Sequence, residues 1–357
     1  IKCPIFFFFI SIMAVLHNRV NNDLLRRKIA ASTEERVTLS FYKYHQFTDV
    51  QAFRDELYKA WQELGVLGRT FVASEGINAQ ISVPAVNWEA FKAHLYAYPI
   101  FEGLRLNLAI ENNPKSFFRL RVAVRKKILS DGLNDAAFDV TNSGKHLNAA
   151  AFNALAQRGD AVIVDMRNHY ESEVGHFIGA IRPDVDNFRE SLPIVENLLK
   201  GKEEQPVLMY CTGGIRCEKA SAWFRHRGFK EVYQLEGGII EYARQVRSQG
   251  LENRFVGKNF VFDERLSEKI TEDVISHCHQ CGAPCDSHTN CRNQGCHLLF
   301  IQCPSCAEKY AGCCSESCRE IAALPEAEQK ALRKGKAQER KVFRKSRASH
   351  LRAPEQV

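Results

Sequence analysis

VLMYCTGGIRC, residues 207–217, decides the fold of this chain of 357 residues. Its four apolar residues are typical of a buried parallel strand, and its pair of glycines predicts a tight turn. The Ala, Trp and Phe that follow are spaced to pack one face of a helix inward. Cys211 therefore lies where a strand ends and a helix begins.

Cys211 is a candidate nucleophile. Backbone N–H groups in such a turn point at one spot, the helix dipole adds positive potential there, and Arg216 supplies a cation. These three features favour a thiolate, and the same N–H groups could hold a second sulfur atom if Cys211 became a persulfide. The alternative is a buried structural cysteine, but a Gly pair and an Arg directly after the Cys favour an anion cradle. We take Cys211 and Arg216 as the catalytic candidates.

The loop from Cys211 to Arg216 resembles the active-site loop of rhodanese-type sulfurtransferases. Three further segments are similar to motifs of that family, namely VIVDMR at 162–167, EVGHFIGA at 173–180 and LEGGI at 235–239. A Cys-based phosphatase on the same fold has a loop one residue longer between Cys and Arg, so this loop fits a sulfur atom better. Within these motifs we expect Asp165, Arg167 and His176 to be structural. Cys217 either resolves a persulfide as a disulfide or is a small residue of the first helical turn.

Composition indicates an ordinary protein of two or three domains, with 45% hydrophobic and 25% charged residues. The net charge of +7 is concentrated near the end, where Lys330 to Arg352 contains ten Lys or Arg and one acid. Ten of the thirteen cysteines lie between Cys278 and Cys318. Because a reactive cysteine elsewhere favours a reducing cytoplasm, metal ligation explains this cluster better than disulfides do.

Two C-x₂-C pairs separated by 21 residues predict one tetrahedral zinc site. Its ligands would be Cys278, Cys281, Cys303 and Cys306. An iron–sulfur cluster uses the same thiolates and is the competing interpretation. The other cysteines could build a second site with His288 or His297, but spacing does not assign its ligands.

The N-terminal third predicts a ferredoxin-like, split βαβ fold. Strands are expected at 37–42, 68–83 (a pair), 104–110 and 117–124, with helices at 50–64 and 88–98. Arg119 and Arg121 would share one face of the last strand, and three more cations follow. Nucleic-acid contact and a solvated edge strand explain this charge equally well.

The predicted organisation is an α/β and α+β multidomain chain. An apolar run at 4–16 is too short to span a membrane, and we expect translation to start at Met13. The parts are an N-terminal extension (1–36), a ferredoxin-like domain (37–128), a linker (129–146), a rhodanese-like domain (147–250), a Cys-rich zinc module (270–320) and a basic tail (325–357).

From Met13 onward the chain resembles the rhodanese-domain tRNA uridine hydroxylases of bacteria. The segments that carry this are VLHNR at 15–19, EGINAQISV at 75–83, MRNHY at 166–170, and residues 210–221 and 277–300. The resemblance implies oxygen-dependent conversion of uridine to 5-hydroxyuridine at wobble position 34 of tRNA, with Cys211 in the place of the persulfide-forming cysteine. It also implies a cytoplasmic protein that contacts the anticodon region of tRNA, with molecular oxygen as co-substrate and neither DNA nor a membrane as partner.

Residue chemistry alone leads to a different first hypothesis. An activated thiolate, a metal module and a basic tail indicate a sulfurtransferase that passes persulfide sulfur to an RNA base or a carrier protein. This remains the alternative function. A non-catalytic zinc and RNA-binding protein, in which Cys211 is dispensable, is the third.

Overall fold

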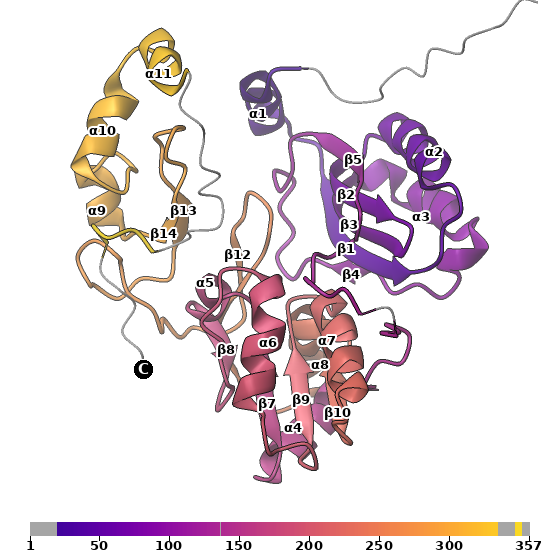
Figure 1. The fold of residues 1–357 in the computed structure, drawn as a ribbon. Coiled ribbons are helices and arrows are strands. Elements are labelled where there is room, and N and C mark those ends of the chain that lie inside the picture. The colour runs from indigo at the N-terminus through magenta and orange to yellow at the C-terminus, as the bar shows by residue number, and fades with distance from the viewer. Residues whose placement is uncertain (1–19, 136, 335–346, 352–357) are drawn as a thin grey trace, which may run out of the picture.

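The computed structural model describes residues 20–135, 137–334 and 347–351. Figure 1 shows three parts, which are an N-terminal domain, a rhodanese-like domain and a C-terminal module. The first is built around a five-stranded sheet, the second around a parallel sheet, and the third contains the cysteine-rich segment. A helix, α1 (Asn22–Ala31), precedes the first sheet within the predicted extension. The predicted start at Met13 lies outside the described residues.

The N-terminal domain has the strand order β4-β1-β3-β2-β5. Leu39 and Phe41 point to one face, where they pack with Trp61 and other core residues of the two helices. The ferredoxin-like prediction is confirmed, although the strand expected at 104–110 is only two residues long. The elements are β1 (Arg36–Tyr44), α2 (Val50–Glu63), β2 (Leu67–Ala73), β3 (Gly76–Pro84), η1 (Ala85–Asn87), α3 (Trp88–Tyr96), η2 (Pro99–Phe101), β4 (Asn107–Leu108) and β5 (Leu120–Val124).

The rhodanese-like domain is built on four parallel strands in the order β6-β10-β9-β7, which confirms the predicted parallel sheet. Helices α4 and α8 contribute to the core on one face and α6 and α7 to the core on the other. The elements are β6 (Lys145–Leu147), α4 (Ala149–Gln157), β7 (Val162–Asp165), α5 (His169–Ser172), α6 (Phe188–Leu198), β9 (Val207–Tyr210), α7 (Ile215–His226), β10 (Val232–Leu235) and α8 (Gly238–Gln249).

A small sheet connects this domain to the Cys-rich module. Strand β11 (Phe255–Phe260) pairs antiparallel with β8 (Gly175–Phe177) and with β12 (Ser267–Lys269). The sequence gives these strands no clear signal because each depends on a distant partner. The module itself contains β13 (His288–Asn290), β14 (Leu299–Ile301), α9 (Pro304–Lys309), α10 (Glu316–Ala323) and α11 (Glu326–Arg333).

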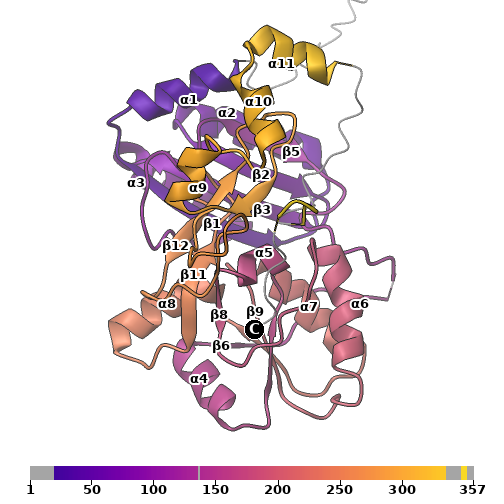
Figure 2. The same cartoon turned by 90° about the vertical axis from the view of Figure 1, so that its left-hand side faces the viewer.

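The segment predicted as a linker contributes to the docking of the first two domains. Lys219 on α7 is 1% exposed and donates to Asp131 of that segment (2.6 Å) and to Glu75 of the β2–β3 turn (2.9 Å). Nearby, Tyr42 of β1 donates to Glu218 of α7 at 3.1 Å. A buried lysine needs such partners, so these contacts fix the N-terminal sheet over the rhodanese-like domain. Figure 2 shows this arrangement from a second side.

The predicted basic tail is in part folded. Residues 326–333 form α11, and Leu351 is buried beside Cys291 in the Cys-rich module. Residues 335–346 and 352–357 lie outside the described part. Among the described residues, no helix has both the length and the apolar character needed to cross a membrane.

Candidate functional site

Cys211 lies between the end of β9 and the start of α7, as predicted. It is 1% exposed, and the N–H of Gly214 donates to its Sγ at 3.1 Å. Gly214 has a φ of 103° and a Cβ there would lie 2.9 Å from the Tyr42 hydroxyl, so this turn requires glycine. The loop therefore directs a backbone donor at the sulfur.

The surroundings of Cys211 favour its thiolate. Burial raises its pKa, but the hydrogen bond from the Cys217 thiol, the charge of Arg216 and the N–H groups of Cys217 and Gly214 together lower that pKa to about 6. Burial, and then the hydrogen bond to Cys211, raise the pKa of Cys217. At neutral pH the pair is thus a thiolate at Cys211 and a thiol at Cys217 that donates to it.

Arg216 has a partner that the sequence analysis missed. Its Nη1 and Nη2 donate to the two carboxylate oxygens of Glu171 at 2.6 and 2.8 Å, and Glu171 is fully buried. This bidentate pair holds the guanidinium while its charge still acts on Cys211. An acid shortly after the VIVDMR motif at 162–167 was the only sequence signal for Glu171, and spacing alone did not link it to Arg216.

The other polar residues of the rhodanese motifs have structural contacts. Arg167 pairs with Asp165 at 2.6 Å, and both side chains are fully buried. Arg167 also donates to the carbonyl of Gly175 at 2.6 Å. The ring of His176 is hydrogen-bonded to the carbonyl of Ser172 at 2.9 Å. These contacts hold β7 and β8 together, which supports the structural interpretation.

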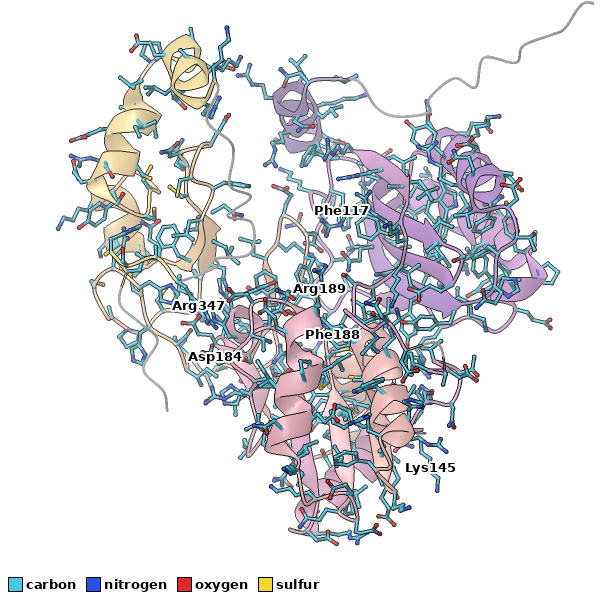
Figure 3. The ribbon with its side chains drawn as sticks, viewed as in Figure 1. Phe117, Lys145, Asp184, Phe188, Arg189 and Arg347 are labelled. Atoms are coloured by element: carbon cyan, nitrogen blue, oxygen red, sulfur yellow. The ribbon has the colours of Figure 1, made fainter. Side chains whose placement is uncertain are left out.

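A cavity of about 510 Å³ opens next to Cys211. One side is the Cys211 loop, and the other is the face of the N-terminal sheet that α2 and α3 leave uncovered. Phe117 and Phe188 line it from the two domains, and Figure 3 shows Phe117 beside the N-terminal sheet and Phe188 at the end of the rhodanese-like domain nearest that sheet. This volume is within the usual range of small-molecule sites.

The four predicted metal ligands come together in the Cys-rich module. The sulfur atoms of Cys278, Cys281, Cys303 and Cys306 all lie within 4.8 Å of one another, with 3.6 Å between the sulfurs of Cys281 and Cys303. A second group, which the sequence did not assign, consists of Cys291, Cys296, Cys314 and Cys318. Its sulfur separations include 3.7 and 3.8 Å, and neither His288 nor His297 belongs to it.

These sulfur separations fit a single metal ion in each group. Four sulfurs at about 2.3 Å from one tetrahedral zinc lie about 3.8 Å apart. An iron–sulfur cluster has several metal atoms between its thiolates and needs wider spacing. The geometry therefore favours a single metal ion in each group over an iron–sulfur cluster.

A cluster of arginines lies beside the cavity at the edge of the N-terminal sheet. Arg121 is on β5, and Arg69 of the neighbouring β2 lines the cavity. Burial and the charges of Arg125 and Arg119 lower the pKa of Arg121. In the part of the chain that the structure describes, no carboxylate lies within ion-pair distance of Arg69, Arg121 or Arg125. The charge of Asp263 acts favourably on Arg69, but Arg119, Arg121 and Arg125 repel one another, and this repulsion favours an anionic partner.

Comparisons with known proteins match the chain in three consecutive parts. The UPF0176 acylphosphatase like domain matches residues 36–128, the Rhodanese-like domain 148–245, and the Rhodanase C-terminal region 256–319. Among solved structures, a rhodanese-like domain from Anabaena sp. aligns with 31% of this chain and 78% of its own length, at 18% identity and a TM-score of 0.25.

Proteins named tRNA uridine(34) hydroxylase are similar over nearly the whole length. Those of Cronobacter sakazakii (57% identical), Sodalis glossinidius (58%) and Escherichia coli O127:H6 (58%) each align over 336 residues, which is 94% of this chain and 96% of the relative. Such identity over such a length shows common family membership. The chain belongs to the tRNA uridine(34) hydroxylase family.

Proposed function

We propose that this protein hydroxylates the uridine at position 34 of tRNA at its C5 atom, with molecular oxygen as co-substrate, in the cytoplasm. The observation that carries the proposal is the position of Cys211, whose Sγ accepts from the Gly214 N–H, beside a cavity of about 510 Å³ in a chain that is 55–58% identical to proteins named tRNA uridine(34) hydroxylase. The cavity is large enough for one nucleoside.

Cys211 is proposed to act as a nucleophile on the base. Its thiolate would form a bond to C6 of uracil, while the electron pair of the C5–C6 double bond moves onto C5 and the neighbouring carbonyl. C5 then becomes the electron-rich atom that takes one oxygen atom from molecular oxygen, while the other oxygen atom leaves as water with two electrons and two protons from an external electron donor. Loss of the C5 proton and of the Cys211 thiolate from C6 then restores the C5–C6 double bond. The Cys217 thiol, which donates to Cys211, stabilises the thiolate before this addition.

The anticodon region of tRNA is the proposed partner. Arg69, Arg119, Arg121 and Arg125 form a cationic surface next to the cavity, and phosphates are the anions that RNA offers. Contacts of this kind position an RNA without reading its sequence. This supports nucleic-acid contact over a merely solvated edge strand.

Zinc is proposed in both cysteine groups, where its role would be structural. Each group has four thiolates at separations that suit tetrahedral zinc, so no position is left for water or substrate. Neither group lines the cavity at Cys211.

Sulfur transfer is the second candidate, because the Gly214 N–H that cradles the Cys211 sulfur could also hold a persulfide. Nucleoside mass spectrometry separates the two functions. A bacterial strain that lacks its own tRNA uridine(34) hydroxylase should regain 5-hydroxyuridine in its tRNA when this chain is expressed. Recovery of a thiolated base instead would favour sulfur transfer.

A further inference from the structure

A row of polar side chains crosses the N-terminal sheet from the Cys211 loop to the arginine cluster. The strand register makes each residue the Cα partner of the next. Since neighbouring strands lie about 4.8 Å apart, the row extends over about 19 Å. Its members are, in order, Asn107, Ser40, Gln80, Arg69 and Arg121.

Asn107 begins the row with a buried oxygen that has no partner. Its Nδ2 donates to the carbonyl of Gly213 in the Cys211 loop at 3.1 Å, which fixes the orientation of the amide. Its Oδ1 is buried and accepts no hydrogen bond from any described residue, although the side chain lines the cavity. Because an unpaired buried carbonyl oxygen is unfavourable, this position suits a ligand that supplies an N–H.

Gln80 offers the opposite polarity. Its Oε1 accepts from Arg69 Nη2 at 3.1 Å, so its Nε2 is the group that can donate to a ligand. Arg69 also donates to the carbonyl of Phe262 and forms no ion pair with a described carboxylate. From the loop outward, the row thus offers an acceptor, a donor and two cations.

We propose that this row binds the wobble nucleotide after its base has left the anticodon stack. The uracil N3–H would donate to Asn107 Oδ1, a uracil carbonyl would accept from Gln80 Nε2, and the flanking phosphates would lie at Arg69 and Arg121. Tyr170 and Phe262 line the same cavity and provide aromatic surface for the base. This inference rests on the proposed function, since it assigns the substrate contacts of that site.

The orientation agrees with the chemistry proposed for Cys211. In a pyrimidine, C6 is opposite N3. A base whose N3 edge faces the sheet therefore turns its C5–C6 edge away from the sheet, toward the wall of the cavity that contains Cys211. The row would be a positioning device, and Cys211 the catalytic residue.

Binding of three anticodon stem–loop RNAs tests the proposal. They carry uridine, N3-methyluridine or no base at the wobble position, and affinity is measured without turnover. The protein should bind the methylated RNA about tenfold more weakly than the uridine RNA, because one buried hydrogen bond is lost. In Asn107→Ala, which removes the acceptor and makes room for the methyl group, the two should bind within about twofold.

Arg121→Ala tests the proposed contact between Arg121 and a phosphate that flanks the base. It should weaken all three RNAs equally and reduce the slope of log affinity against log salt by about one. The matched control is Lys59→Ala, because Lys59 is exposed on α2, which covers the other face of the sheet. Lys59→Ala should change neither the affinities nor the slope.

Equal affinity of the unaltered protein for all three RNAs would overturn the proposal, whatever the folding of the variants. If folded Asn107→Ala still binds the N3-methyluridine RNA more weakly than the uridine RNA, Asn107 does not contact the base. The binding site and the proposed reaction can fail separately. A protein that binds the methylated RNA more weakly but produces no 5-hydroxyuridine in cellular tRNA would support the binding site and contradict the proposed reaction.

Discussion

At the residue scale, the hydrogen bonds to Cys211 contribute much of the stabilisation of its thiolate. The charge of Arg216 contributes less, because Arg216 is also paired with Glu171. The rate of alkylation of Cys211 should therefore rise with pH through about 6 and level off near neutral pH, since only the thiolate reacts. Cys217→Ala removes the thiol donor and should move the midpoint to higher pH. Cys217→Ser keeps a hydroxyl donor and should shift the midpoint less. An unchanged midpoint in Cys217→Ala would contradict the hydrogen bond from the Cys217 thiol to Cys211.

Because Arg216 is paired with Glu171, an Arg216 variant should change the stability of the fold as well as the pKa of Cys211. Arg216→Ala leaves a fully buried carboxylate without its partner, so it should lower the free energy of unfolding by about 3–5 kcal/mol. Adding Glu171→Gln should restore much of that stability and still leave the Cys211 pKa raised. Urea unfolding together with alkylation rates separates the two effects. A stable Arg216→Ala would show that the ion pair contributes little.

At the element scale, local patterns predicted the strand–loop–helix around Cys211, the ferredoxin-like sheet and the first cysteine group. These features could be predicted because each depends on the hydrophobic periodicity or on a short residue spacing within one segment of the chain. The contacts that complete the site join distant segments, such as Asn107 with Gly213 and Lys219 with Glu75 and Asp131. The sequence carries no periodic signal for a pairing of this kind, so the cavity itself could not be predicted.

The cysteine groups lead to a prediction at the same scale. The purified protein should contain two zinc ions per chain, and Cys303→Ser should retain one, because the second group does not include Cys303. Cys285→Ser is the matched control, since Cys285 is buried in the same module but outside both groups. Elemental analysis that finds iron with sulfide, or no metal, would contradict the assignment.

At the scale of the whole molecule, a residue late in the chain contacts the rhodanese-like domain. Arg347 pairs with Asp184 and, at 3.0 Å, with Asp186, which lines the cavity. Figure 3 shows Arg347 and Asp184 side by side. Arg347, one basic residue of the tail, is thereby held beside the proposed RNA site.

Truncation after Leu324 should therefore weaken tRNA binding and flatten its salt dependence, because phosphate contacts release counterions. Arg347→Ala removes a single cation and should have a smaller effect on both. Filter binding at several salt concentrations measures them. Unchanged affinity and slope after truncation would show that the tail takes no part in binding.

Analysis of tRNA nucleosides tests the proposed reaction at Cys211 most directly. A strain without its own tRNA uridine(34) hydroxylase is complemented with the unaltered chain or with Cys211→Ser, and 5-hydroxyuridine is measured by mass spectrometry. Serine is nearly isosteric but stays protonated at neutral pH and cannot carry a sulfane sulfur, so the fold should persist while 5-hydroxyuridine is lost. Full modification with Cys211→Ser would contradict the catalytic role of this residue.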